Sequence, residues 1–231
     1  PDERIICALD VPTTAEAAAL AERIGDAIGF YKVGLQLFAV DGMALARELK
    51  AQGRKIFLDW KLHDIGATVE KATANLAGAD CDLLTVHARP QVMAAAARGA
   101  AGSKMKVLGV TVLTSLTADD LAADDHSLSP ADLVDRRVRQ ALEAGIDGVV
   151  SSPHEAARAR ALADEAGRPD FLIVTPGVRP VGAALDDQAR AATPQAALQA
   201  GATHLVIGRP ITASSDPRAA AQQIAQQIAL I

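Results

Sequence analysis

The chain has 231 residues, a length that a single α/β barrel can use in full, so length alone does not require two domains. Half of the residues are hydrophobic but only 3% are aromatic, which predicts a core of Ala, Val, Leu and Ile and argues against a module that stacks nucleic-acid bases on aromatic rings. The net charge of −5, with both signs mixed, argues against a nucleic-acid or anionic-membrane surface, while a local basic site for a phosphate remains compatible with it.

Short apolar runs rich in β-branched residues alternate with longer Ala-rich stretches along the whole chain. This alternation predicts strands separated by helices. In chain order, we expect strands at Arg4–Asp10, Phe30–Val33, Lys55–Asp59, Leu83–His87, Val107–Leu113, Gly148–Val150, Phe171–Thr175 and His204–Ile207. Helical patterns lie between them, for example at Thr14–Ala27, Gly42–Ala51, Val69–Ala77, Ala131–Ala144 and Ala219–Leu230.

Several helix starts carry capping residues. A Ser, Thr or Asp before a proline suits a helix start, because the side chain accepts a hydrogen bond from the first turn and proline fits the first helical position. Such pairs are Ser129-Pro130, Ser152-Pro153, Thr193-Pro194 and Asp216-Pro217, and capping boxes are expected for Thr13 with Glu16 and for Ser152 with Glu155. This structural role accounts for Ser151, Ser152 and His154 without a Ser–His nucleophile.

Eight strands that alternate with helices, without a linker or a change of composition, predict one closed parallel (β/α)8 TIM barrel over residues 1–231. The alternative is an open, doubly wound sheet, which usually carries a Gly-rich turn after its first strand. Here that strand ends in Leu9-Asp10-Val11-Pro12, with no glycine. A barrel places its active site at the C-terminal ends of the strands.

The N-terminal Pro1-Asp2-Glu3-Arg4 is charged and leads into an apolar strand, so we expect no signal peptide and a cytoplasmic protein. No apolar run approaches the ~20 residues of a membrane-spanning helix, so no membrane association is expected. Cys7 and Cys81 both lie in apolar runs and predict buried, reduced thiols.

Charged residues gather at the predicted ends of the first three strands, namely Asp10, Lys32, Asp59 and Lys61, with Asp64 in the loop that follows. Asp59 and Lys61 are two residues apart, so an extended chain projects them to the same face. A solvated loop of alternating charge is the simpler interpretation. At the mouth of a barrel, however, crowded charges interact strongly, so each needs an oppositely charged neighbour or a ligand. This favours a functional site over a solvated loop.

The end of the last strand predicts a phosphate site. Gly208 lets a backbone amide approach the ligand, and Arg209 supplies a planar cation, although the pair also fits an ordinary strand-to-helix turn. The connection Pro176–Thr193 is long enough to form a lid, and Gln188 within it could hold a phosphate. No metal site is expected, because the histidines share no ligand spacing: His63, His87, His126 and His204.

The pattern Asp59-x-Lys61-x-x-Asp64 occurs together with Ala8–Asp10, Tyr31–Gly34, Phe57–Ile65, Val110–Ser115, Thr175–Pro180, Asp186–Gln188 and Gly208–Thr212. Together these segments resemble the orotidine 5′-monophosphate decarboxylase family, in its bacterial branch, along nearly the whole chain. Each motif is modest alone, and the set is specific. The resemblance implies a decarboxylase that forms uridine 5′-monophosphate from orotidine 5′-monophosphate in the last step of its de novo biosynthesis, without a cofactor.

The resemblance also implies roles for individual residues. Lys32, Asp59, Lys61 and Asp64 would form an alternating charge network, with Lys61 as proton donor and Asp64 contributed by the partner subunit of a homodimer. Substrate contacts would come from Asp10 and Lys32 at the ribose, Thr68 at the neighbouring subunit's ribose, Thr114 at the pyrimidine edge, and Gln188, Gly208 and Arg209 at the phosphate, with Arg179 supporting the lid. The ammonium group of Lys61 can stabilise the carbanion left by carbon dioxide and then protonate it.

The chain departs from the family pattern at Trp60, Leu62, Gly66 and Ala67, where the family often has Leu, Phe, Pro and Asn. These changes spare the charged residues, so we expect intact chemistry with an altered loop and altered packing at the dimer interface.

Two other functions fit part of the pattern. Sugar-phosphate decarboxylases or aldolases of the same barrel group show a similar motif but use magnesium and need further acidic ligands. The segments Thr175–Pro180 and Asp186–Gln188 favour the nucleotide enzyme instead. A non-catalytic phosphate-binding barrel is disfavoured, because such a protein would not need to keep Lys61 in a costly charge network.

Overall fold

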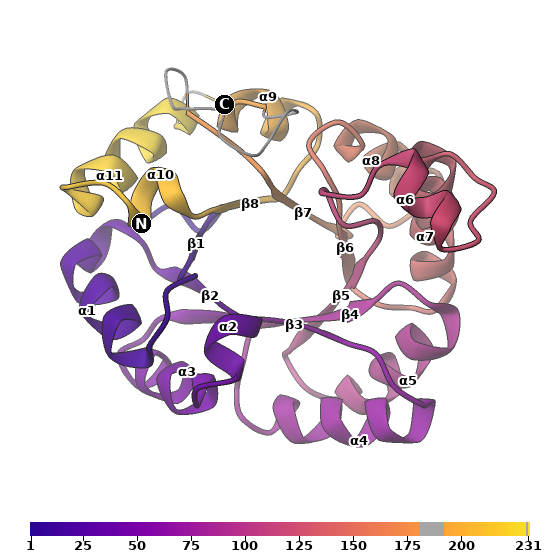
Figure 1. Ribbon diagram of the computed structural model, residues 1–231, viewed down its shortest axis with the longest axis horizontal. Coiled ribbons are helices and arrows are strands. Elements are labelled where there is room, and N and C mark those ends of the chain that lie inside the picture. Colours follow the sequence, from indigo (N-terminus) through magenta and orange to yellow (C-terminus); the bar gives the residue numbers. More distant parts are fainter. Residues whose placement is uncertain (181–191, 230) are drawn as a thin grey trace.

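Eight parallel strands close into a barrel with helices around its outside (Figure 1). The computed structural model describes residues 1–180, 192–229 and 231. The strands follow each other in chain order, and β8 pairs with β1 through Ile5 and Leu205, which closes the barrel. The predicted TIM barrel is therefore confirmed.

The strands are β1 (Ile5–Ala8), β2 (Phe30–Gly34), β3 (Lys55–Leu62), β4 (Leu83–His87), β5 (Lys106–Val110), β6 (Gly148–Val150), β7 (Leu172–Pro176) and β8 (His204–Ile207). The helices are α1 (Thr14–Ile24), the 3₁₀ turn η1 (Gly25–Ala27), α2 (Leu35–Phe38), α3 (Gly42–Ala51), α4 (Gly66–Ala77), α5 (Pro90–Ala100), α6 (Ala118–Ala123), α7 (Pro130–Glu143), α8 (Ala156–Glu165), α9 (Pro194–Gln199), α10 (Arg209–Thr212) and α11 (Pro217–Ile228).

The predicted elements agree with these bounds to within two residues at most ends, with four corrections. α1 ends at Ile24, and the rest of its predicted range, Gly25–Ala27, forms the 3₁₀ turn η1. β3 continues to Leu62, three residues beyond its predicted end, and β5 stops at Val110 rather than at Leu113. α4 begins at Gly66, three residues before its predicted start at Val69. The prediction began too late because the first turn is exposed or half-buried, so the apolar periodicity is visible only from Val69 onward. The predicted end of the last helix, Leu230, lies outside the described residues.

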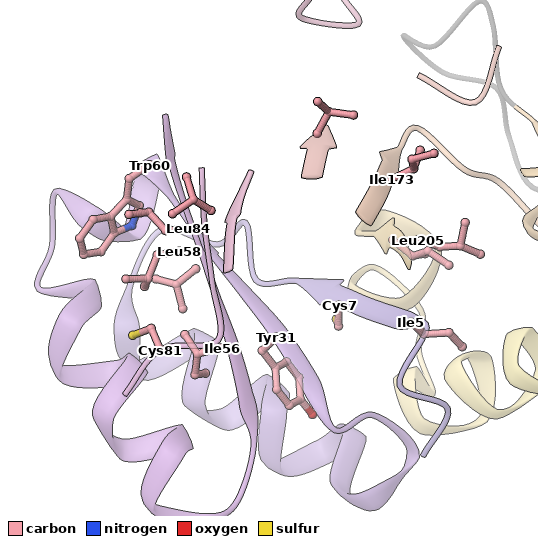
Figure 2. Close-up of a cluster of buried hydrophobic side chains, with 14 of the residues drawn as sticks. Ile5, Cys7, Tyr31, Ile56, Leu58, Trp60, Cys81, Leu84, Ile173 and Leu205 are labelled. Carbon is pink, nitrogen blue, oxygen red and sulfur yellow. The ribbon is translucent and has the colours of Figure 1, made fainter. Parts of the chain in front are cut away.

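The hydrophobic core has two layers. One cluster lies inside the barrel and consists of Ile6, Ala8, Phe30, Phe57, Leu83, Leu108, Val174 and Val206. The alternate residues of the same strands, among them Ile5, Cys7 and Tyr31, belong to the larger cluster that packs under the helices (Figure 2). Because both faces of the strands are covered, apolar residues occupy both faces, and the charged residues of β2 and β3, such as Lys32 and Asp59, are exceptions to this pattern.

The capping residues fix most of the predicted helix starts. Ser129, Thr193 and Asp216 each accept a hydrogen bond from the backbone amide three residues later, before a proline in the first turn. Thr13 does the same for Glu16 at 3.1 Å. The prediction for Ser152 was wrong, since α8 begins at Ala156. The Ser152 amide instead donates to Glu155 Oε2 at 3.1 Å, which closes a separate turn before the helix.

Both cysteines are buried free thiols, as predicted. Burial raises the pKa of Cys7 to about 12 and that of Cys81 to about 11, so neither thiol is a ready nucleophile at neutral pH. In the part of the chain that the structure describes, no helix has the length and apolar character needed to cross a membrane.

Gly148 on β6 marks a place where the barrel wall admits no side chain. A Cβ atom there would lie 2.4 Å from Leu172 O and 2.9 Å from Leu108 Cδ2. We predict that Gly148→Ala lowers the free energy of unfolding by about 1–3 kcal/mol, because β6 and β7 must separate to relieve the overlap. Urea unfolding followed by circular dichroism measures the loss.

Gly78→Ala is the matched control for this prediction. Gly78 ends α4 with an ordinary helical φ of −68°. A Cβ atom there would lie 3.5 Å from Asn75 O and 3.7 Å from Ala74 O, which is ordinary van der Waals contact. The control should change the free energy of unfolding by less than about 0.5 kcal/mol. Equal losses for the two variants would contradict the steric explanation.

Candidate active site

A cavity of about 600 Å³ opens at the C-terminal ends of the strands. Its volume lies within the ~300–1,000 Å³ typical of small-molecule sites, and its place is the one at which TIM barrels hold their active sites. Its charged lining residues are Asp10, Lys32, Asp59, Lys61, Arg179 and Arg209. The sequence had predicted each of these six as a site residue.

Four of these side chains form one chain of alternating charge. Lys32 Nζ lies 2.9 Å from Asp10 Oδ1 and 3.4 Å from Asp59 Oδ2. The other oxygen of that carboxylate, Asp59 Oδ1, lies 2.8 Å from Lys61 Nζ. The ends of β1, β2 and β3 thus place two carboxylates and two ammonium groups in a continuous row across one side of the cavity.

Burial makes this row electrostatically demanding. The side chains of Lys32 and Asp59 are only 9% and 15% exposed. Burial alone would lower the pKa of Lys32, but the carboxylates of Asp59 and Asp10 outweigh it and raise that pKa above its ordinary value. Burial likewise opposes ionisation of Asp59, yet Lys32 and Lys61 hold its pKa below the ordinary value. Both groups therefore stay charged at neutral pH.

The backbone of β3 leaves the extended conformation at Lys61, which corrects the extended geometry expected for this segment. Lys61 has a φ of +50°, in the left-handed region that non-glycine residues rarely occupy. The pairing of β3 with β4 also shifts register between Leu58 and Leu62. Asp59 and Lys61 meet within this bulge, while Trp60 between them is 7% exposed and packs against Phe38 at 4.7 Å between ring centroids.

Other predicted residues lie on the rest of the rim. Thr114, after β5, and Gly208, after β8, both line the cavity. Arg179 is 8% exposed, its amide donates to Ala192 O at 3.0 Å, and its Nη1 donates to Val178 O at 3.3 Å. Arg179 therefore ties the two described ends of the long connection to the cavity wall. Gln188 lies outside the described residues.

Two predicted residues lie away from the cavity of this chain. Asp64 and Thr68 are exposed, and neither lines the cavity. Asp64 Oδ1 accepts a hydrogen bond from the amide of Ile65 at 2.6 Å. Among the described residues, the ion pair of Lys61 is made with Asp59 and not with Asp64.

Ser151 is a cavity residue that the sequence reasoning had assigned only to capping. It follows β6, lines the cavity and is 1% exposed. Its Oγ finds no hydrogen-bond partner among the described residues, so a bound ligand could satisfy it. Its position directly after a predicted strand was the signal available in the sequence.

The described residues contain no group of three or more His, Cys, Asp or Glu side chains that could hold a metal ion. What the cavity offers is a row of fixed charges on one side and a basic, hydroxyl-bearing rim elsewhere. Such a site can bind an anionic ligand, stabilise negative charge and transfer a proton.

Comparison with known proteins gives consistent matches along the chain. Residues 3–224 match the family described as Orotidine 5'-phosphate decarboxylase / HUMPS family. An orotidine 5′-phosphate decarboxylase of Caulobacter vibrioides is 62% identical over 228 residues, which cover 99% of this chain and 98% of that protein. One from Cereibacter sphaeroides is 53% identical over 231 residues, covering 98% of this chain and 97% of that protein.

Solved structures agree with these relatives. The crystal structure of orotidine 5′-phosphate decarboxylase from Lactobacillus acidophilus is 37% identical, with a TM-score of 0.85, and the match covers 99% of this chain and 100% of that one. An uncharacterised conserved protein from Geobacillus kaustophilus is 33% identical with a TM-score of 0.82, covering 97% and 99% of the two chains.

The lowered pKa of Asp59 gives a pH-dependent prediction. A carboxyl group whose pKa is lower in the folded chain than in the unfolded chain stabilises the fold at any pH above its unfolded-state pKa, which is 3.8 for Asp59. This stabilisation is lost as the pH falls through the lower pKa of the folded chain. The stability difference between the wild type and Asp59→Asn should therefore be larger at pH 7 and narrow below about pH 4. Urea unfolding across this pH range measures it.

Asp26→Asn serves as the control, because it removes an exposed carboxylate that pairs with Arg218 at 2.6 Å. A surface pair of this kind should contribute only about 0–1 kcal/mol. A difference between wild type and Asp59→Asn that stays constant with pH would contradict the stabilising role of the ionised Asp59.

Proposed function

Because the chain belongs to the orotidine 5′-phosphate decarboxylase / HUMPS family and matches curated decarboxylases over nearly its whole length, we propose that it converts orotidine 5′-monophosphate to uridine 5′-monophosphate. This carboxy-lyase reaction is the last step of uridine monophosphate biosynthesis. A cytoplasmic location follows from that role.

The observation that carries the proposal is the row Asp10, Lys32, Asp59 and Lys61 on one side of the cavity. A carboxylate buried between two ammonium groups is costly to assemble unless it is used. It holds Lys61 Nζ at 2.8 Å from Asp59 Oδ1, so the ammonium is oriented before any substrate arrives. Such preorganised charge is the main means by which enzymes stabilise a developing anion.

This geometry supports the following reaction scheme. The bond between the pyrimidine carbon and the substrate carboxylate breaks, and its electron pair stays on the ring carbon as carbon dioxide leaves. The Lys61 ammonium stabilises that negative charge and donates a proton to the carbon, and solvent reprotonates the amine. Asp59 also lies beside the position of the substrate carboxylate, where charge repulsion adds to the ground-state energy. No cofactor takes part in this scheme.

The remaining rim holds the rest of the nucleotide. Asp10 and Lys32 contact the ribose hydroxyls, and Thr114 reads the pyrimidine edge. Gly208, Arg209 and Gln188 bind the phosphate, and Arg179 supports the connection that covers it. Because the phosphate is remote from the bond that breaks, its binding energy can be used to close the site and to lower the barrier.

The complete site requires a second copy of the chain. Asp64 and Thr68 are exposed and do not line the cavity of their own chain, so they are available to complete the site of a partner in a homodimer. Apolar side chains are exposed on the same side of the barrel mouth, on and after α2 and before α4: Leu35, Phe38, Val40 and Ile65, from 43% to 69% exposed. A subunit interface over this region would bury them.

A magnesium-dependent sugar-phosphate enzyme is the competing function. It would need acidic metal ligands beyond the charged row, and the described residues provide no group of three such ligands. Activity after chelation separates the two functions directly.

We predict that the purified protein decarboxylates orotidine 5′-monophosphate in excess EDTA, measured as loss of substrate absorbance. The rate should equal the rate without EDTA, because Lys61 and not a metal ion stabilises the carbanion. Lys61→Ala, purified in the same way, is the control for contaminating enzyme and should show only background activity. Activity that disappears on chelation and returns with magnesium would overturn the cofactor-free mechanism, and wild-type activity no higher than the control would overturn the function.

We further predict that Lys61→Ala and Asp64→Ala are each nearly inactive alone but complement each other after subunit exchange. A mixed dimer has one site with both substitutions and one site with neither. Random exchange of equal amounts makes half of the dimers mixed, so about a quarter of all sites should recover activity. Exchange is verified independently by native mass spectrometry. Absence of recovery in verified mixed dimers would show that Asp64 acts within its own chain.

A further inference from the structure

The bulge in β3 faces a single residue of β4. Leu58 pairs with Leu84 and Leu62 pairs with Val86, so Asp59, Trp60 and Lys61 stand opposite Thr85 alone. A bulge leaves backbone groups of the longer strand without their ladder partners. Something other than a β4 backbone group must therefore satisfy the amide of Lys61.

The Thr85 hydroxyl supplies this partner and makes a second bond. Its Oγ1 accepts a hydrogen bond from the Lys61 amide at 3.0 Å and donates its one proton to Asp59 Oδ1 at 3.0 Å. Thr85 is 0% exposed and does not line the cavity. Its hydroxyl therefore serves the two charged residues and is not available to a substrate.

These bonds act where the backbone is strained. Lys61 has a φ of +50°, a conformation that costs a non-glycine residue free energy and persists only when its surroundings fix it. Thr85 holds the amide side of Lys61 while Asp59 holds the ammonium side at 2.8 Å. Asp59 Oδ1 accepts hydrogen bonds from the Thr85 hydroxyl and from the Lys61 ammonium group, so its position is fixed as well.

We propose that Thr85 is a positioning residue for the decarboxylation, whose hydroxyl holds Asp59 and Lys61 in the geometry that the reaction requires. This inference rests on the proposed function. It makes the β3 bulge, and not only the residues on it, part of the active site. Small displacements of an oriented catalytic group lower the rate steeply, so loss of the hydroxyl should affect turnover more than substrate binding.

Two substitutions separate the hydroxyl from the packing of this side chain. Thr85→Val keeps the volume and removes both hydrogen bonds, whereas Thr85→Ser keeps both bonds and removes a methyl group. A positioning role predicts that Val lowers kcat by about tenfold to a hundredfold with little change in KM, and that Ser stays within about threefold of the wild type. A packing role predicts the reverse order.

The pH profile gives a readout that packing would not change. The Thr85 hydrogen bond is one of the interactions that lower the pKa of Asp59, after those with Lys32 and Lys61. Without it that pKa rises, so the acidic limb of kcat/KM should move to higher pH in Thr85→Val and stay in place in Thr85→Ser.

Hydrogen exchange of the Lys61 amide tests the clamp without relying on activity. In protein labelled with ¹⁵N-lysine, this amide should exchange slowly in the wild type and in Thr85→Ser. It should exchange faster in Thr85→Val, while the amide of Lys32, within β2, remains protected and reports that the barrel is folded. If Thr85→Val does not fold, rapid exchange of Lys61 in the wild type would still overturn the proposal.

The outcomes distinguish this inference from the proposed function. In one outcome, protection of the Lys61 amide depends on the Thr85 hydroxyl but the protein is inactive toward orotidine 5′-monophosphate. This result would overturn the proposed decarboxylation and the catalytic part of the Thr85 role, and would leave Thr85 with a structural role only. In an active enzyme, full activity of Thr85→Val, or a larger loss in Thr85→Ser than in Thr85→Val, would overturn the positioning role alone.

Discussion

The carboxylate of Asp59 is shared by two ammonium groups, at 3.4 Å from Lys32 and 2.8 Å from Lys61, and the rest of the site depends on this arrangement. A buried carboxylate without cationic partners would take up a proton, and a buried ammonium without anionic partners would lose one. Lys32 is in turn shared between Asp59 and Asp10. Each charge is tolerated because its neighbours are charged, so the four groups behave as a unit.

The barrel holds these four charged groups in fixed positions. Neighbouring parallel strands end side by side, which brings together charges that are distant in the sequence. Ala8 pairs with Lys32, and the Leu9 amide donates to Lys32 O at 3.0 Å, so Asp10 directly follows a segment that is bonded to the Lys32 backbone. Two apolar layers, one inside the barrel and one beneath the helices, keep the strands in place. The stability of these layers allows strain, such as the left-handed backbone of Lys61, to persist at the rim.

Different parts of the cavity rim carry different kinds of side chain. The ends of β1, β2 and β3 carry the alternating charges, while the segments after β5, β6, β7 and β8 contribute Thr114, Ser151, Arg179 and Arg209 to the cavity. This separation suits a nucleotide, whose reacting ring and whose phosphate lie at opposite ends. Asp64 and Thr68 are exposed and do not line this cavity, which is why the proposed site includes a second copy of the chain.

The barrel could be predicted from the amino-acid sequence, because eight apolar runs alternate with helical stretches and several helix starts carry capping residues such as Ser129 and Thr193. The sequence also identified the charged residues of the cavity, since strand ends are local features and parallel strands bring them together. Tertiary structure alone decided how those residues meet. The bulge of β3 depends on pairing with β4, and the contacts of Thr85 and the burial of Ser151 depend on neighbouring strands that no local pattern encodes.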